Sequence, residues 1–376
     1  MKDFFKFSKA LAVFVGTIIG VGIFGLPYVA SKAGFFVVLG YFILITSAVI
    51  FIHLFFGEIA AGTKGLHRLP GYAAEYLGPK WGKISLFILG LAISGALLAY
   101  LIVGGKFLQL YFSNFFGGGP IFWTLIFFSF GAFLIFKGIR TISQIELTLL
   151  LIFFAILIIF LVKALPFINL NYLSNLDWKF FTFPYGVTLF SLWGSTVIPE
   201  IKEMLFPNIK LLKKVIITGI SLSTLTYLFF IFIILGVSGP LTSKEAISGF
   251  IQAVGDNILK LGFIFGFITT FTSFITLGLA LKKTLWYDFG LSKNISWGIS
   301  CFLPLSLFFT GLREYIQVIG FIGAIMLGIE GIIIVFIYRN FLKFKEKKFN
   351  PLIYSFCILF ILGILFETFY LFIKSI

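Results

Sequence analysis

Long apolar runs, each about long enough to cross a lipid bilayer, constrain this chain more than any other feature. A helix needs roughly 20 mostly apolar residues to cross the hydrocarbon core. About eleven runs meet that length, at 9–32, 35–58, 82–112, 120–137, 142–164, 184–206, 209–237, 257–285, 293–311, 314–338 and 351–374. A soluble domain is about a quarter charged, whereas only 11% of this chain is charged. The predicted fold class is therefore an all-α polytopic membrane protein with about eleven transmembrane helices.

The positive charge lies in the short connections between these runs. Lys and Arg number 29 against 14 Asp and Glu. They do not gather into one basic patch, so we expect a lipid bilayer and no nucleic acid as partner. With a cytoplasmic N-terminus, 21 positive residues fall in inside connections and 7 in outside ones. Cytoplasmic loops carry the excess of Lys and Arg, so this bias sets the orientation of the chain. We expect a multi-pass protein of the cell (plasma) membrane. Its N-terminus is then cytoplasmic and its C-terminus extracytoplasmic.

The two halves of the chain repeat one pattern. In each, a glycine stands five residues before a proline, at Gly22 and Pro27 and again at Gly194 and Pro199, with an offset of 172 residues. The same offset aligns the third, fourth and fifth apolar runs with the eighth, ninth and tenth. Each half has five spans, an odd number, so the second half is inverted relative to the first. This predicts three units, which are a first repeat at 1–164, an inverted repeat at 184–338 and an extra transmembrane helix at 351–376.

The matched glycine and proline positions predict that spans 1 and 6 are broken helices. Glycine, and proline without its N–H, weaken the hydrogen-bond ladder of a helix. Unpaired backbone groups cannot face lipid, but they can line a cavity and bind a ligand. Free N–H groups suit a carboxylate, and free carbonyls suit an ammonium or a metal cation. The pattern therefore favours a small zwitterion near the bilayer midplane, and inverted repeats with broken helices are typical of secondary transporters.

Two motifs carry a family resemblance. Gly-Thr-Ile-Ile-Gly-Val-Gly-Ile-Phe-Gly-Leu-Pro-Tyr at 16–28 resembles the first-helix motif of amino acid permeases in the amino acid–polyamine–organocation superfamily. Trp-Gly-Ser-Thr-Val-Ile-Pro-Glu at 193–200 resembles the sixth helix of its amino acid/auxin permease and aromatic amino acid permease branches. The resemblance covers essentially the whole chain. It implies secondary active transport of amino acids by alternating access, as cation-coupled symport, with spans 1, 2, 6 and 7 rocking against spans 3, 4, 5, 8, 9 and 10.

The resemblance also implies a substrate site at the two breaks. The substrate carboxylate would meet the first break, at Gly20, Val21, Gly22 and Ile23. The amine and side chain would meet the sixth span, at Phe190, Ser191, Trp193, Gly194, Ser195 and Thr196. Of these, Phe190 and Trp193 are either an outer gate or ordinary packing aromatics. Tyr100 either adds a hydroxyl to the carboxylate site or packs between helices.

A cation site is implied beside the first break. Its residues would be carbonyls of the first helix and hydroxyl residues of the eighth span, at Gly16, Ile19, Thr269, Thr272 and Ser273. Sodium is the ion this set favours. The alternatives are that Ser and Thr bond from helix to helix or hydrogen-bond back to their own helix. Some proton-coupled relatives place a lysine of the fifth span there. The fifth span here has no central lysine, which weakens that form of proton coupling without excluding it. We expect no other cofactor.

Four further polar residues lie in or near the spans. Glu330 is a carboxylate inside span 10, and such residues are functional candidates by default; it is a proton carrier, a gate partner or a structural group. Glu200 follows the second break. Lys106 lies nearer the outer surface, where its side chain can snorkel. His53 in span 2 is expected to pack.

Other classes of function fit less well. A membrane enzyme would need a catalytic cluster, metal-ligand spacing or long loops, and the sequence has none of them, so we expect no enzyme. A nutrient sensor built on a transporter fold, or a transporter of another small amine or organic cation, remains open. The sequence does not define which amino acid is carried, the direction of transport or the oligomeric state.

Overall fold

The computed structural model describes residues 2–65, 67–138, 142–255 and 259–375. Within these ranges every regular element is a helix and no strand occurs. Arg140, counted above among the inside charges, lies outside the described residues. The elements are α1 (Lys2–Ile18), α2 (Gly22–Ala33), α3 (Phe35–Gly62), α4 (Leu69–Leu77), α5 (Pro79–Phe116), α6 (Pro120–Lys137), α7 (Ile142–Ala164), η1 (Leu165–Phe167), η2 (Leu170–Leu173), η3 (Trp178–Phe180), α8 (Pro184–Leu192), η4 (Ser195–Val197), α9 (Ile198–Leu205), α10 (Leu211–Ser238), η5 (Gly239–Leu241), α11 (Ile247–Val254), α12 (Leu259–Lys283), η7 (Thr284–Asp288), α13 (Lys293–Phe309), α14 (Tyr315–Phe321), η8 (Ile322–Leu327), α15 (Gly328–Phe344), η9 (Pro351–Ile353) and α16 (Tyr354–Ser375).

The long helices correspond to the predicted spans. Among the described residues, 8 helices are long and apolar enough to cross a membrane, and the pair α1 and α2, bent by 50°, makes a ninth. The two other predicted spans are short or divided. The run 293–311 is α13, which has 17 residues, and the run 184–206 is divided into α8, η4 and α9. An all-helical polytopic membrane fold is thus confirmed, while the count of eleven stays a prediction.

Both predicted interruptions occur. The first falls between Ile18 and Gly22, and the second lies at Trp193 and Gly194. The prolines act differently at the two places. Pro199 stands in the first turn of α9, where a missing N–H costs nothing, whereas Pro27 lies inside α2. The break in span 1 therefore coincides with its glycines rather than with its proline.

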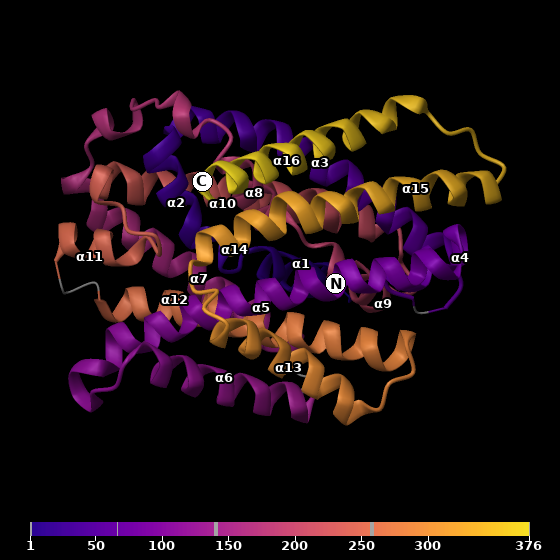
Figure 1. Ribbon diagram of the computed structural model, residues 1–376, viewed down its shortest axis with the longest axis horizontal. Helices are drawn as coiled ribbons and strands as arrows, with labels where there is room; N and C mark the ends of the chain where they lie inside the picture. The colour runs from indigo at the N-terminus through magenta and orange to yellow at the C-terminus, as the bar shows by residue number, and fades with distance from the viewer. Residues whose placement is uncertain (1, 66, 139–141, 256–258, 376) are drawn as a thin grey trace.

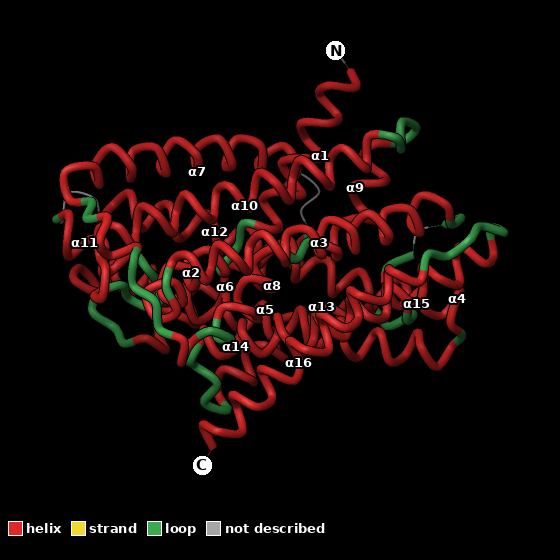
Figure 2. Tube along the Cα trace, turned by 90° about the horizontal axis from the view of Figure 1, so that it is seen from above, coloured by secondary structure: helices red, strands yellow, loops and turns green. Residues whose placement is uncertain are grey.

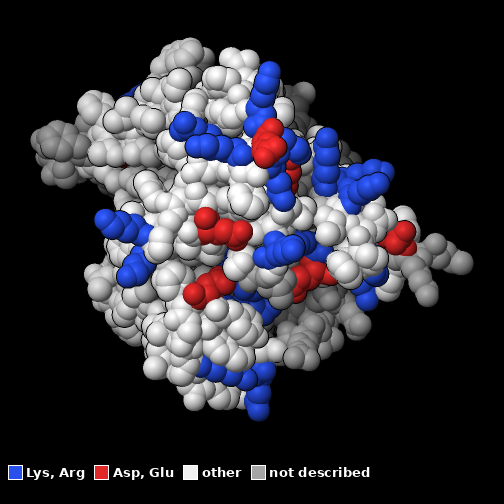
Figure 3. All heavy atoms as spheres, turned by 90° about the vertical axis from the view of Figure 1, so that its right-hand side faces the viewer, with Lys and Arg blue, Asp and Glu red and all other residues white. Residues whose placement is uncertain are grey.

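The long helices lie side by side along the longest axis of the molecule, with α4 at one end and α11 at the other (Figure 1). Figure 2 shows α7 and α16 on opposite flanks of the bundle. The end that carries α4 collects many Lys and Arg side chains with a few carboxylates among them (Figure 3). Many exposed side chains elsewhere are Phe, Leu and Ile, as expected for a surface that faces lipid.

The two broken spans contact each other in the middle of the bundle. Helix α1 packs against α10, α7 and α9, and α2 packs against α8 and α10. Helix α5 and the π-helical segment η8 pack against each other, and η8 also packs closely on α8. The breaks, α5 and η8 therefore surround one central region, where the candidate site lies.

Candidate substrate and cation sites

The backbone of the first break changes its hydrogen-bond register. In a continuous helix the Gly20 N–H would donate to the Gly16 carbonyl, but here it donates to Ile18 O at 2.8 Å. Likewise, the Ile23 N–H donates to Gly20 O at 3.3 Å instead of to Ile19. The carbonyls of Gly16 and Ile19 thereby lose their helical donors and can accept from another partner or bind a cation.

A histidine holds the second break. The Gly194 N–H donates to Nε2 of His53 at 2.9 Å, and the other ring nitrogen, Nδ1, lies 2.8 Å from Val49 O. A carbonyl only accepts and an amide N–H only donates, so the proton sits on Nδ1 and the ring is neutral. His53 is fully buried. The expected packing histidine is thus a specific partner of the break.

One tyrosine hydroxyl joins the two breaks. The Tyr227 hydroxyl, on α10, lies 2.6 Å from Ile18 O and 2.8 Å from Ser191 O. These carbonyls stand at the ends of α1 and α8. Tyr227 is fully buried. Its hydroxyl therefore donates to the carbonyls at these two helix ends, which water would otherwise satisfy. This residue was not singled out from the sequence, because a lone tyrosine in an apolar run gives no signal.

The two broken spans also touch directly. A Cβ atom at Gly22 would meet both the side chain and the backbone of Ser191. The Ser191 hydroxyl donates to Val187 O within its own helix at 2.7 Å. Glycine at position 22 therefore permits the close approach of α2 to α8, in addition to ending the break.

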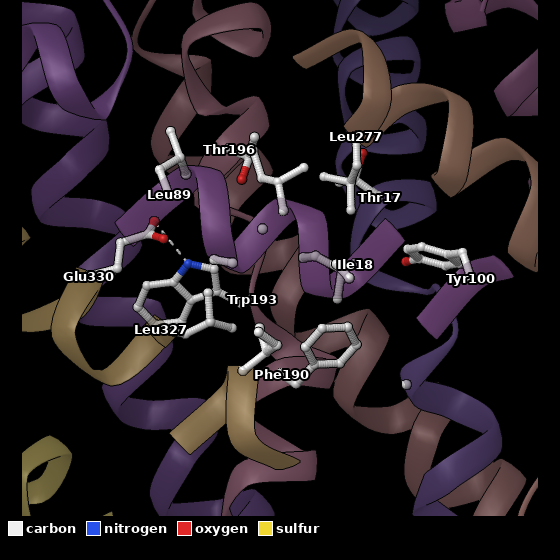
Figure 4. Close-up of a pocket in the computed structure, with 16 residues that line it drawn as sticks. Thr17, Ile18, Leu89, Tyr100, Phe190, Trp193, Thr196, Leu277, Leu327 and Glu330 are labelled. Carbon is white, nitrogen blue, oxygen red and sulfur yellow. Dashed lines mark hydrogen bonds between the residues drawn. The ribbon is translucent and has the colours of Figure 1, made fainter. Parts of the chain in front are cut away.

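A narrow cavity of about 50 Å³ lies at this junction. Figure 4 shows Tyr100 and Thr17 on one side, Glu330 on the other, and Phe190 and Trp193 between them. A water molecule needs roughly 10–15 Å³ measured in this way, so the space holds a few waters and an amino acid enters only when its walls separate. The walls comprise Thr17, Ile18, Gly22, Leu89, Ala92, Ile93, Ala96, Tyr100, Phe190, Trp193, Gly194, Thr196, Leu277, Ile322, Leu327 and Glu330.

The structure places some of the predicted substrate residues on this cavity and others behind it. The predicted residues that line it are Gly22, Phe190, Trp193, Gly194 and Thr196. The others are part of the breaks or support them; these are Gly20, Val21, Ile23, Ser191 and Ser195, all of them buried.

One face of α5 forms a wall that was missed apart from Tyr100. Its members are Leu89, Ala92, Ile93, Ala96 and Tyr100. They recur at helical spacing, so periodicity along span 3 was the signal that could have found them.

Glu330 connects span 10 to the second break. Its Oε1 accepts hydrogen bonds from Nε1 of Trp193 at 3.1 Å and from the Ser195 hydroxyl at 2.5 Å. The residue is 1% exposed. Glu330 also lines a smaller cavity of about 10 Å³, whose far wall includes Arg68. The carboxylate therefore lies between the central cavity and the end of the molecule that carries α4.

The residues of the predicted cation site lie together. A cavity of about 20 Å³ is lined by Gly16, Ile19, Thr269 and Thr272. The Ser273 hydroxyl donates to Gly16 O at 3.1 Å. Freed carbonyls and hydroxyls are oxygen donors of the kind that hard cations prefer, and unwound carbonyls bind coupling ions in broken-helix transporters. The wall contributed by α7 is apolar and consists of Leu149, Leu150 and Phe153.

Tyr100 links the two sites. Its side chain interacts with the Ser273 hydroxyl and with the backbone of Val21, and a Cβ at Gly20 would collide with its ring. The residue is buried and lines the central cavity. A hydroxyl in contact with both sites gives a physical path along which occupancy of one site can affect the other.

Both ends of the cavity are closed. On the side of α11, a Cβ at Gly186 would meet the backbone of Gly320, so α8 and α14 approach closely. Lys244 and Glu314 form an ion pair there, and the hydrogen bond that Lys244 donates to the Glu314 carboxylate raises the pKa of Lys244.

On the side of α4, Nη2 of Arg68 lies 2.7 Å from Oε1 of Glu200. Burial acts to lower the pKa of Arg68, but the Glu200 carboxylate raises it, and the net shift is upward. The Arg68 guanidinium also lies 5.9 Å from the centre of the Tyr287 ring, so it contacts both the sixth and the eighth span.

An all-helical bundle with two opposed broken helices around a closed cavity defines a secondary transporter, not an enzyme. The chain belongs to the tryptophan/tyrosine permease family, whose pattern matches residues 5–370. It is 26% identical over 339 residues to the tyrosine-specific transport system 1 of Haemophilus influenzae, covering 82% of this chain and 81% of that protein. The family and this relative agree with the amino acid permease resemblance drawn from the two motifs, and the protein is a membrane permease for secondary transport of amino acids.

Solved structures share the fold. The structure of MhsT in complex with L-phenylalanine has a TM-score of 0.72 at 18% identity, covering 96% of this chain and 97% of that one. The structure of Mhp1, a nucleobase-cation-symport-1 family transporter, in a closed conformation has a TM-score of 0.67 at 15% identity, covering 93% and 80%. At these identities the likeness concerns the fold, with its inverted repeat and broken helices 1 and 6.

Proposed function

We propose that this permease is a cation-coupled symporter of aromatic amino acids. The observation that carries the proposal is the pairing of two sites across one break. The central cavity has largely apolar walls with aromatic side chains at its centre, and the oxygen-lined cavity lies against the same broken helix. The family and its tyrosine-transporting relative support the substrate class.

In the proposed complex the substrate carboxylate binds the N–H groups of the first break, at 20–23. The positive end of α2, which begins there, favours an anion. The ammonium binds carbonyls at the end of α8, near Phe190, and beside the end of α1, where the Ile18 carbonyl itself is already occupied by the Gly20 N–H and the Tyr227 hydroxyl. The ring then extends along α5 towards Trp193 and Thr196. This arrangement uses the ten residues predicted from the sequence either as walls or as the backbone behind them.

Sodium is the ion proposed for the second site. Gly16 and Ile19 supply carbonyl oxygens freed by the break, and Thr272 and Ser273 supply hydroxyls, with Thr269 on the same wall. In the alternative of proton coupling, a titratable group would stand at this place. The described wall from α7 is apolar, which supports sodium.

The orientation and division of the chain are proposed from the charges. The charged end in Figure 3 is the end that carries α4 in Figure 1, and Arg68 stands directly before α4. This end would be cytoplasmic, which places α11 outside and the molecule in the cell (plasma) membrane. The repeats would span 1–164 and 184–338, with 351–376 as the extra helix. Separation of α8 from α14 opens the outer side, and separation of Arg68 from its neighbours opens the inner side.

The test is uptake into proteoliposomes of a labelled mixture of phenylalanine, tyrosine and tryptophan. An inward sodium gradient is compared with an inward proton gradient of equal size. We expect accumulation that depends on sodium. Accumulation driven only by protons would overturn the sodium site, and absence of uptake or binding of any amino acid by folded protein would overturn the substrate class.

A further inference from the structure

Glu330 is an exceptional group in the wall of an otherwise mainly apolar cavity. Its Oε1 accepts from Trp193 and Ser195. Its other oxygen, Oε2, is buried and has no hydrogen-bond partner among the described residues. A buried acceptor without a donor costs free energy. A donor that arrives with the substrate would therefore stabilise this oxygen.

The position of Glu330 relates it to the ring of the substrate. In Figure 4 it lies across the cavity from Tyr100, which adjoins the first break. In the proposed function the substrate carboxylate binds at that break, so the ring points away from Tyr100. The walls along the way are apolar, with Leu89, Ile93 and Leu327 among them. The distal end of an aromatic side chain then reaches Glu330.

We propose that Oε2 of Glu330 accepts a hydrogen bond from the ring donor of the substrate and so determines specificity. The donor is the phenol O–H of tyrosine or the indole N–H of tryptophan. Phenylalanine has no such donor and leaves Oε2 unpaired, so the site selects against it. This inference rests on the proposed function, because the proposed function sets the orientation of the amino acid in the cavity.

The same geometry disfavours two other partners for this carboxylate. In the proposed function the α-ammonium already has carbonyl partners at the ends of α1 and α8. A basic side chain such as that of lysine would have to lie along the apolar wall of α5 and bring a full charge into a buried cavity, which is costly unless it is completely paired. A neutral ring with a single polar atom matches the walls and the carboxylate together.

The experiment compares matched substrates on matched variants in proteoliposomes. Apparent affinities are measured for tyrosine against phenylalanine, and for tryptophan against 3-benzothienylalanine, in which sulfur replaces the indole N–H. The variants are Glu330→Met, which removes the acceptor, and Glu330→Gln, which keeps the shape. Glu367→Gln is the control, because it removes a half-buried carboxylate of α16 that does not line the cavity. Thermal unfolding verifies that each variant is folded.

The two variants give different expected patterns. In Glu330→Met the tyrosine-to-phenylalanine affinity ratio and the tryptophan-to-benzothienylalanine ratio both fall, each by about tenfold, as expected when the ring donor is left buried without an acceptor. In Glu330→Gln the Nε1–H of Trp193 can only donate, so it bonds the amide oxygen of the glutamine. The amide NH₂ group then occupies the place of Oε2. Indole only donates, whereas phenol donates and accepts. The tryptophan ratio therefore falls much more than the tyrosine ratio.

Several outcomes would overturn this role of Glu330. An equal loss of affinity for all four substrates in Glu330→Met would indicate a gating or coupling group. Unchanged ratios in a folded Glu330→Met protein would show that the ring does not reach it. Competition by lysine that disappears in Glu330→Gln would assign the carboxylate to a cationic substrate. Wild-type protein that binds no aromatic amino acid would overturn the proposed function itself, and this role with it.

Discussion

Removal of one hydroxyl at Tyr227 tests how the broken helices are stabilised. The substitution Tyr227→Phe keeps the buried ring and deletes only the oxygen that bonds Ile18 O and Ser191 O. A hydroxyl carries one proton, so the two acceptors share it and the loss is smaller than that of two independent bonds. Bonds of this kind are worth about 0.5–1.5 kcal/mol, with similar values in membranes, and a desolvated carbonyl is left behind. We expect a decrease of about 1–2 kcal/mol in the free energy of unfolding.

The assay is equilibrium unfolding of the purified protein in detergent micelles, followed by tryptophan fluorescence. A decrease of that size raises the unfolded-to-folded ratio about five- to thirtyfold. Tyr111→Phe is the matched control, because the Tyr111 hydroxyl is not involved in any described hydrogen bond and its ring stacks on Phe263. If Tyr227→Phe unfolds within about 0.3 kcal/mol of the control, the carbonyls at the breaks do not depend on this hydroxyl and the reasoning is wrong.

Three further substitutions test the rest of the site. Gly22→Leu places side-chain atoms where Ser191 already lies, so we expect loss of detectable substrate binding with normal membrane insertion. A substrate affinity like that of the wild type would contradict the assignment of Gly22 to the substrate site. Ser273→Ala removes the hydroxyl that bonds Gly16 O and is expected to raise the sodium concentration for half-maximal uptake about tenfold or more, with no change if sodium binds elsewhere. Arg68→Gln leaves Glu200 unpaired and should open the inner side. A second substitution, Thr284→Cys, places a thiol on the inner cavity, and this thiol should react several-fold faster with a thiol reagent when Arg68 is replaced. An unchanged rate would show that Arg68 does not keep the inner side closed.

Sequence patterns determined the features that depend on local chemistry. Lipid-facing helices follow from the length of the apolar runs alone, because a helix satisfies its own backbone groups wherever it lies. The breaks near Gly22 and Gly194 follow from backbone freedom at glycine, which acts within one turn. The grouping of Gly16 and Ile19 with Thr272 and Ser273 followed from a family resemblance. The structure places Gly16, Ile19 and Thr272 on one small cavity, and Ser273 donates a hydrogen bond to Gly16 O.

Only the tertiary structure decided which side chains meet at the breaks. His53 bonds Gly194 across 141 residues, Tyr227 reaches Ile18 across 209, and Glu330 reaches Trp193 across 137. None of these pairs has a spacing that a sequence pattern marks. Each depends on how one helix is rotated and shifted against another, and this is set by the packing of the whole bundle. The chain by itself thus specified where its helices break, and the fold determined which side chains contact each break.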